Sequence, residues 1–394
     1  MDAKQFTQMI SNKDFFILKK MQYKYSADDV KEMLVLLNST MYETLPIKDF
    51  EANALVYLPS VLQVNLNAVK SLLTPQSSQT AYGLQAMEEE IHSTLTIENI
   101  ESSRDSIRKI LQGYAPANDS EERIYGMKKG LEFISDTENK ITEENLHKLY
   151  QLTVGNYLTD DSHLPEGQFY RNDTVYIVGK NPGRNVEHQG LPHEELPRHM
   201  GKLIAFANAE DSMNDLLKAA AIHFYIGYIH PYFDGNGRTA RLVHLWYLVQ
   251  RGYSAAMFTS FSSYINESRK KYYNAFSLVE ENAGISKRID ITPFLAYFIE
   301  NVYDKLGKME PSNNTLLRFE SALSEGKITE KEKALWNFVL SAYGTNEFST
   351  KQLERDFGDA AYATIRSFVI KFEKLHLLKQ QKYGSRVKYS ILST

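Results

Sequence analysis

The segment His230-Pro-Tyr-Phe-Asp-Gly-Asn-Gly-Arg-Thr-Ala-Arg241 decides how the rest of this sequence is interpreted, because it joins two apolar stretches. Residues 212–229 are apolar nearly all round, which predicts a helix at the centre of the core. A second apolar helix is expected to start near Gly237. The loop between them therefore lies at a helix N-terminus, where unpaired N–H groups and the helix dipole attract anions.

The loop residues have the chemistry of a phosphate site. Gly235 and Gly237 allow the backbone to approach a ligand closely. Arg238 and Arg241 are three residues apart, on one face of the first helical turn, where two guanidinium groups can bind several phosphates. Asp234 would oppose phosphate binding unless Mg²⁺ bridged its carboxylate and the phosphate oxygens.

His230 adds a candidate base to this anion site. A neutral imidazole just outside the loop can take a proton from an incoming hydroxyl. A base, a metal carboxylate and two arginines around a phosphate loop together indicate phosphoryl or nucleotidyl transfer. The alternative is a helix-capping loop with a core histidine and surface arginines, which would not require all of these residues together.

The pattern resembles the signature of the Fic family, in which His, an aromatic residue, Asp or Glu, Gly-Asn-Gly-Arg and a second Arg recur at fixed spacing. Every position matches here, except that Tyr232 stands where Phe is usual. The resemblance covers roughly residues 84–305. It implies a mainly α fold, with a Fic-type helical core and a β-hairpin flap over the active site. Residues 166–190, with the β-prone run Thr174–Val178 and a Pro-Gly turn, are similar to that flap.

The resemblance also implies the reaction, which is transfer of AMP from ATP to a Ser, Thr or Tyr hydroxyl of a target protein. His230 would deprotonate the hydroxyl, and Asp234 would hold Mg²⁺. The remaining motif residues would hold the phosphates: Gly235, Asn236 and Gly237 the α-phosphate, Arg238 the β-phosphate and Arg241 the γ-phosphate.

An adenine pocket is harder to locate. Tyr272 and Tyr273 lie where relatives often carry paired tyrosines, and they are candidates for packing on the base. Val178 and Gly179 on the flap are further candidates. In a chain with 25 Tyr residues, two tyrosines in the core are the competing interpretation.

Residues 94–99 resemble the inhibitory motif of Fic proteins that inhibit themselves. Thr94, Glu98 and Asn99 match Ser/Thr, three residues, Glu, then Gly or Asn. In such proteins the glutamate pairs with the second motif arginine, here Arg241, and takes a donor that the γ-phosphate needs. The same glutamate helps some relatives to remove AMP. An ordinary solvent-facing glutamate at a helix end is the competing interpretation.

The domain organisation is predicted as an N-terminal helical region with the inhibitory motif, a Fic catalytic core, a linker and a winged-helix-like domain, over residues 1–110, 111–305, 306–325 and 326–394. A helical stretch near 84–114 is expected to be interrupted around Ser93–Asn99. GKMEPSNNT has the polar, proline-containing composition of a linker. Three helices and an alternating stretch around a glycine turn follow, in the order of a winged helix.

The C-terminal module has two candidate partners. Residues 330–394 contain eleven Lys and Arg against seven Asp and Glu, and basic residues cluster on the wing at Lys379, Lys382, Arg386 and Lys388. DNA is one candidate, and a protein or a second copy of the chain is the other. Phe368, Ile370 and Phe372 of the third helix are expected in the core.

Composition limits the function classes. The chain has 394 residues, 43% hydrophobic and 24% charged, with a net charge of −4 and no cysteine. Disulfides and thiolate chemistry are excluded, and neither a signal peptide nor a membrane span is predicted, so a cytoplasmic protein is expected.

The alternatives left open are a different nucleotide donor, such as UTP or a phosphocholine nucleotide, removal of AMP, and a DNA-binding regulator with a vestigial Fic domain.

Overall fold

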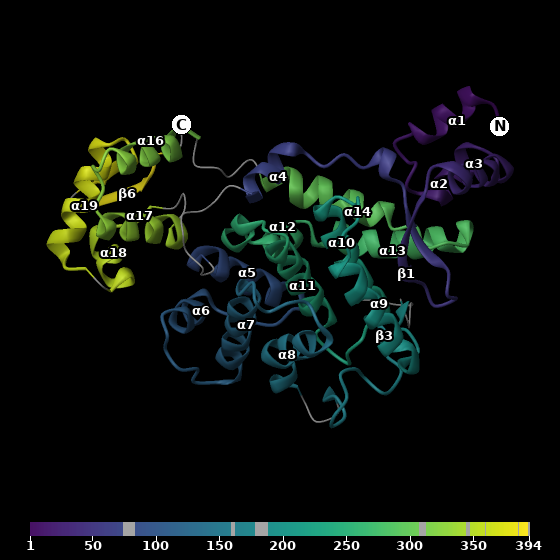
Figure 1. Ribbon diagram of the computed structural model, residues 1–394, viewed down its shortest axis with the longest axis horizontal. Helices are drawn as coiled ribbons and strands as arrows, with labels where there is room; N and C mark the ends of the chain where they lie inside the picture. The colour runs from purple at the N-terminus through teal and green to yellow at the C-terminus, as the bar shows by residue number, and fades with distance from the viewer. Residues whose placement is uncertain are drawn as a thin grey trace.

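The computed structural model describes residues 1–73, 83–158, 162–177, 188–306, 313–343, 347–358, 360–384 and 386–392. Helices dominate this part of the chain, and its strands form three short antiparallel pairs, so the mainly α prediction is confirmed. A central helical body lies between N-terminal helices at one end and a C-terminal domain at the other (Figure 1).

Two long helices form the centre of this body. α10 (Asp215–Ile229) and α11 (Asn236–Gln250) pack against each other and are buried along most of their length. The other helices of the body surround them: α5 (Leu84–Ile97), α6 (Arg104–Leu111), α7 (Asp119–Ser135), α8 (Glu143–Thr153), α9 (Leu196–Asn208), α12 (Phe261–Glu267), α13 (Arg269–Ser286), α14 (Thr292–Phe298) and α15 (Asp304–Leu306).

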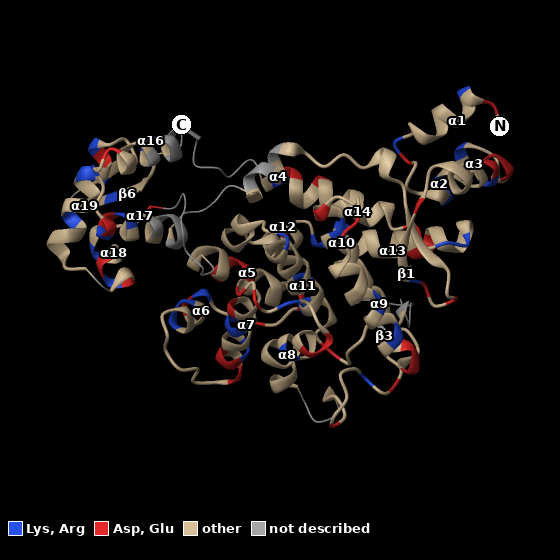
Figure 2. Ribbon diagram, viewed as in Figure 1, with Lys and Arg blue, Asp and Glu red and all other residues tan. Residues whose placement is uncertain are grey.

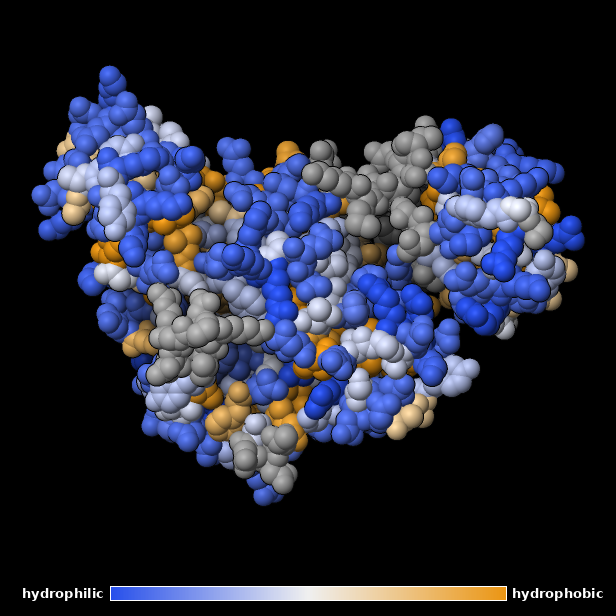
Figure 3. All heavy atoms as spheres, turned by 180° about the vertical axis from the view of Figure 1, so that it is seen from behind, coloured by the Kyte–Doolittle hydropathy of each residue, from blue (hydrophilic) through white to orange (hydrophobic). Residues whose placement is uncertain are grey.

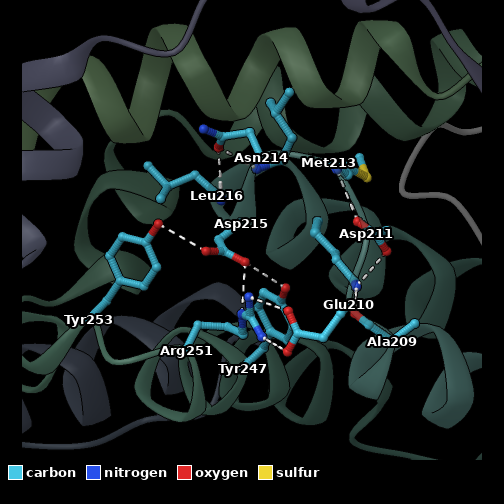
Figure 4. A network of polar contacts seen from close by, with 12 residues as sticks. Ala209, Glu210, Asp211, Met213, Asn214, Asp215, Leu216, Tyr247, Arg251 and Tyr253 are labelled. Atoms are coloured by element: carbon cyan, nitrogen blue, oxygen red, sulfur yellow. Dashed lines mark hydrogen bonds and ion pairs between the residues drawn. The ribbon is translucent and has the colours of Figure 1, made fainter.

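A polar network joins the start of α10 to the end of α11 (Figure 4). Asp215 accepts hydrogen bonds from Tyr247, Arg251 and Tyr253 at 2.9, 2.9 and 3.1 Å. Arg251 also forms two hydrogen bonds with Glu210, at 2.6 and 3.2 Å. These contacts hold the two helices together at the end opposite the glycine-rich loop.

The N-terminal region differs from the predicted helical region 1–110. Helices α1 (Ala3–Ile10), α2 (Leu18–Lys24) and α3 (Ala27–Thr40) form a small core of their own. An unpredicted hairpin of β1 (Glu43–Lys48) and β2 (Ala54–Tyr57) and then α4 (Leu66–Leu73) follow. Buried residues from Leu45 to Leu306 form one continuous core, so no structural boundary lies at residue 110.

The predicted interruption around Ser93–Asn99 is displaced in the structure. α5 continues to Ile97, and the chain leaves helical geometry from Glu98 to Ser103. Asn99 has a φ of 59°, in the left-handed region that ends helices and that Asn tolerates better than most residues. The motif therefore starts on α5 and ends just beyond it.

The C-terminal domain contains α17 (Glu330–Ala342), α18 (Thr350–Phe357), α19 (Tyr362–Lys374) and a hairpin of β5 (Leu378–Tyr383) and β6 (Arg386–Ile391), in the predicted order. The predicted linker 306–325 is wrong in its second half. α16 (Asn313–Ser324) lies there and buries Phe319 and Ala322 in the domain core. These two residues have helical spacing, but the proline and asparagines that precede them made the segment resemble a linker. Ile370, predicted in the core, is 39% exposed.

Two other features bear on the site. A short antiparallel pair, β3 (Tyr176–Ile177) and β4 (His188–Gln189), lies within the predicted flap. A cleft of about 660 Å³ separates helices α5 and α6 from α17 and α18.

None of the helices in the described ranges combines the length and the apolar character that crossing a bilayer requires.

Candidate active site

The loop between α10 and α11 has a strained backbone at both ends. His230 follows α10 with φ 53° and ψ 68°. This left-handed conformation is energetically unfavourable for any residue that has a Cβ atom. Gly235 precedes α11 with φ 77°, and a Cβ there would lie 2.5 Å from Val154. Glycine is therefore required at position 235 for both its dihedral angle and its space.

The tautomer of His230 follows from one hydrogen bond. Its Nδ1 lies 2.7 Å from the carbonyl oxygen of Gly227. A carbonyl only accepts hydrogen bonds, so the proton of the neutral ring must be on Nδ1. Nε2 then carries the lone pair, as a general base requires.

Arg171 supports the backbone of His230, and sequence reasoning missed it. Its side chain is 2% exposed and donates to the carbonyl of His230 at 2.7 Å and to the carbonyls of Asp173 and Leu191. Burial lowers the pKa of Arg171. A buried arginine bonded to carbonyls on both sides of the flap region ties that region to the end of α10, and no local sequence pattern signals such a role.

The loop is fixed from within by Asn236 and Tyr232. The Asn236 amide donates to the Tyr232 carbonyl at 2.8 Å and accepts from the Tyr232 N–H at 2.9 Å. The ring of Tyr232 stacks on Tyr150 with centroids 3.8 Å apart. The side chain expected on the α-phosphate is thus engaged in holding the loop instead.

Asp234 and Arg238 form the outer part of the site. The Asp234 carboxylate is 58% exposed and accepts from Arg238 at 2.9 Å and from the Gly235 N–H at 2.6 Å. Arg238 is buried, and its Nε has no hydrogen-bond partner within the described residues. A buried cationic donor left unsatisfied is costly, and an anion in front of the loop would satisfy it.

Arg241 brings the loop together with residues 94–99, the predicted inhibitory motif. Its Nε donates to the Thr94 hydroxyl at 2.8 Å, and one Nη donates to Glu98 Oε1 at 2.6 Å. Glu98 also lies against the first turn of α11, because a Cβ at Gly237 would be 2.4 Å from Glu98 Oε1. The predicted contact between Glu98 and Arg241 is present.

The charges of this pair stabilise each other. Burial alone would raise the pKa of Glu98, but the positive charges of Arg241, Arg238 and Arg269 hold it below its ordinary value. Burial opposes the charge of Arg241 as well, and Glu98 raises the pKa of Arg241 despite it. The carboxylate is therefore ionised at neutral pH.

Two residues that sequence reasoning missed hold α5 in place. Glu90 is buried and accepts from Ser260 Oγ at 3.0 Å and the Ser262 N–H at 2.9 Å, at the start of α12. Arg269 donates to Asn99 at 2.9 Å and to the Thr96 carbonyl at 3.2 Å. The available signal for Glu90 was its spacing of four residues from Thr94, which places both residues on one face of α5.

The candidate adenine residues separate in the structure. Tyr272 is 3% exposed, and its hydroxyl lies 2.7 Å from His223 Nε2, so the core interpretation holds for it. Tyr273 is 44% exposed, and its ring lies against Arg269. Val178 and Gly179 fall outside the described residues.

The described residues contain no group of three or more His, Cys, Asp or Glu side chains that could hold a metal ion. Mg²⁺ commonly binds through one carboxylate together with substrate phosphates. The exposed carboxylate of Asp234 fits that mode, and a cage built from protein side chains alone is not present in these ranges.

Residues 140–248, which include α10 and nearly all of α11, match the model of the Fic/DOC family. A curated protein from Drosophila ananassae named protein adenylyltransferase Fic is 26% identical over 225 residues, which cover 55% of this chain and 40% of that protein. The protein of the same name from Culex quinquefasciatus is 25% identical over 302 residues, covering 72% of this chain and 55% of that protein. The chain thus spans about half the length of these relatives.

Two solved structures share the fold. A Fic family protein from Desulfovibrio desulfuricans aligns with a TM-score of 0.50 and 17% identity, covering 84% of this chain and 96% of that one. Residues 134–508 of Fic-1 from C. elegans also align with a TM-score of 0.50 and 17% identity, covering 77% and 83%. The predicted Fic-type helical fold is confirmed by these alignments.

Proposed function

We propose that this protein transfers AMP from ATP to a hydroxyl side chain of a target protein. The proposal depends above all on one observation, the hydrogen bond from His230 Nδ1 to the Gly227 carbonyl. This bond leaves the lone pair of the ring on Nε2, next to the loop that leads into α11 with its two buried arginines. A base next to an anion site is the arrangement that attack of a hydroxyl on a phosphate requires. The names of the matched relatives support AMP as the transferred group.

In the proposed reaction, the target hydroxyl oxygen attacks the α-phosphorus of ATP. The bond from that phosphorus to the oxygen bridging to the β-phosphorus breaks, and pyrophosphate leaves. His230 Nε2 accepts the hydroxyl proton. The first N–H groups of α11 face the α-phosphate, and Arg238 and Arg241 hold the β- and γ-phosphates.

Asp234 is the residue that would hold Mg²⁺. A bound Mg²⁺ would neutralise phosphate charge and so relieve repulsion between that carboxylate and the nucleotide. Arg238, which contacts Asp234, would then be available to the β-phosphate, and its unpaired Nε supports this role.

We infer that Glu98 inhibits this activity. Its carboxylate uses a donor of Arg241 that the γ-phosphate needs, and it lies over the first turn of α11. Thr94 keeps its own hydrogen bond to Arg241 Nε, so removal of Glu98 would free one donor without releasing the arginine. ATP bound while Glu98 is in place would have its α-phosphate misaligned for in-line attack.

Removal of AMP from a modified target is the second candidate, and the ionised carboxylate of Glu98 beside the loop favours it. A carboxylate in that position can accept a proton from an attacking water. Incubation with a target modified by labelled AMP separates the two activities, because only removal releases free AMP. A different nucleotide donor is tested in the incorporation assay by replacing labelled ATP with labelled UTP.

The decisive experiment incubates the Glu98→Gly variant with labelled ATP and cell lysate, followed by mass spectrometry for added AMP. We expect AMP on the variant itself and on target proteins, above the level of the unmodified protein. The matched control carries His230→Ala in the Glu98→Gly background and should show none. No increase with Glu98→Gly would reject self-inhibition, and equal labelling with the control would reject the enzyme.

A further inference from the structure

We propose that the C-terminal domain binds duplex DNA through α19 and the β5–β6 hairpin, a function separate from AMP transfer. The charge of this domain is unevenly distributed. Residues 362–391 contain seven Lys and Arg and one acidic residue, Glu373, whereas residues 313–358 contain six Lys and Arg and seven Asp and Glu. The basic excess therefore belongs to one helix and one hairpin, and it exceeds what a mixed surface would show.

Most of these cations are available to a ligand. Lys371 is paired with Glu332 at 2.7 Å and is set aside. The other six side chains are exposed: Arg366, Lys374, Lys379, Lys382, Arg386 and Lys388. Of these, Lys388 has an acidic neighbour, Glu347, at 3.7 Å, near the limit of an ion pair. The ribbon is blue, the colour of Lys and Arg, at several places along α19 and β6 in Figure 2.

The register of the hairpin places several of the cations on one face. Gln381 pairs with Lys388, and Tyr383 pairs with Arg386, so these residues share a face with Lys379. The opposite face carries Leu378, Tyr389 and Ile391, which are buried in the domain core. Lys379, Arg386 and Lys388 therefore project from the solvent side of the hairpin.

α18 and α19 follow each other in the order of a helix-turn-helix and contact each other. α18 ends at Phe357, Gly358 turns the chain with a φ of 71°, and α19 starts at Tyr362 against α18. The buried stripe of α19 is Ile365, Phe368, Val369 and Phe372, which leaves Arg366 and Ile370 on the exposed stripe. The first residues of such a second helix contact base edges in the major groove, and an arginine there suits guanine.

The basic surface is also accessible. The cleft facing α5 and α6 is lined on the domain side by residues of α17 and α18 and of the segment between them. α19 lies at the outer edge of the molecule in Figure 1, and the domain surface seen in Figure 3 is largely hydrophilic. A duplex on α19 would thus meet charged side chains and would not displace the catalytic body.

The test measures binding of the full-length protein to a short labelled duplex by fluorescence anisotropy at several salt concentrations. Phosphate contacts by Lys374, Lys379, Arg386 and Lys388 predict a slope of about −4 in log K against log[salt]. The triple variant Lys379→Ala/Arg386→Ala/Lys388→Ala should flatten the slope by about 3 and weaken binding more than about tenfold at 0.1 M salt. Lys327→Ala, an exposed lysine of the same domain outside this surface, should leave both unchanged.

Three outcomes would overturn the proposal. The first is no salt-dependent binding to the duplex at low salt. The second is a flattening of the slope by Lys327→Ala of about one third of that in the triple variant, which would mean that net charge rather than this surface attracts DNA. The third is tighter binding to single-stranded RNA or to an acidic peptide than to the duplex. Circular dichroism of each variant establishes that the fold is retained, and the assay needs no ATP, so it is independent of the transfer reaction.

Discussion

An arginine–carboxylate contact lies at each end of the α10–α11 pair, and the two contacts differ in what surrounds them. At one end, Arg251 contacts both Glu210 and Asp215, and two tyrosine hydroxyls complete the coordination of Asp215. At the other end, Arg241 contacts one carboxylate, which comes from residue Glu98 of a distant helix segment. Beside it, Arg238 has a buried Nε with no partner in the described part of the chain.

The comparison distinguishes a contact that holds two helices together from a contact that lies in the proposed phosphate site. In the network at Asp215, both carboxylate oxygens accept hydrogen bonds, and its members come from two short stretches, residues 210–215 and 247–253, at the start of α10 and the end of α11. The loop end has more positive charge than its own elements neutralise, and the residue that supplies the missing negative charge is the one expected to inhibit. A carboxylate in that position stands where a phosphate is proposed to bind.

The largest effect is expected at His230. In the Glu98→Gly background, His230→Ala should reduce AMP incorporation by about 10²–10⁴-fold, because it removes the proposed base. Incorporation is measured with labelled ATP at saturating target concentration. The melting temperature should change little, since the ring is at the edge of the core. Residual activity within tenfold would show that another group accepts the proton.

Next in size is the effect of removing Glu98. Glu98→Gly should raise incorporation by about 5- to 150-fold, the range of a typical coupling energy between sites. The control is Asp215→Asn, which removes a carboxylate from the other end of the same helix pair and should not raise activity. An increase in both variants would mean that loosening the pair, rather than freeing Arg241, activates the protein.

Sequence reasoning predicted the loop because its residues lie at fixed local spacing, and it predicted the contact between Glu98 and Arg241 through the resemblance of residues 94–99 to the inhibitory motif of Fic proteins. It missed Arg171 and Glu90, whose partners are carbonyls and serine groups on other elements. The β1–β2 hairpin was missed for the same reason, since it is held by long-range bonds such as the one from Tyr225 to the Lys48 carbonyl. Tyr272 and Tyr273 are adjacent in sequence, and only the packing of α13 separates a core ring from an exposed one.

A smaller effect, on stability alone, is expected at Asp215. Asp215→Asn should lower the stability by about 2 kcal/mol, because it weakens three hydrogen bonds that the side chain accepts. For a body of this size, the melting temperature should fall by roughly 4–8 °C, as measured by differential scanning fluorimetry. An unchanged melting temperature would show that the network does not stabilise the fold.

The smallest effect is expected when the pH is changed, because inhibition by Glu98 should be independent of pH near neutrality. The pKa of Glu98 is held below its ordinary value by Arg241, Arg238 and Arg269, which outweigh burial. A lowered carboxyl pKa means that the ion pair is fully present above the ordinary pKa of a glutamate and is lost only as the pH falls through the lowered value. The ratio of incorporation by Glu98→Gly to that by the unmodified protein should therefore stay constant between about pH 5.5 and about pH 8. A ratio that declined towards one as the pH fell from neutral would mean that the carboxyl titrates in that window and that the contact with Arg241 is weaker than its geometry implies.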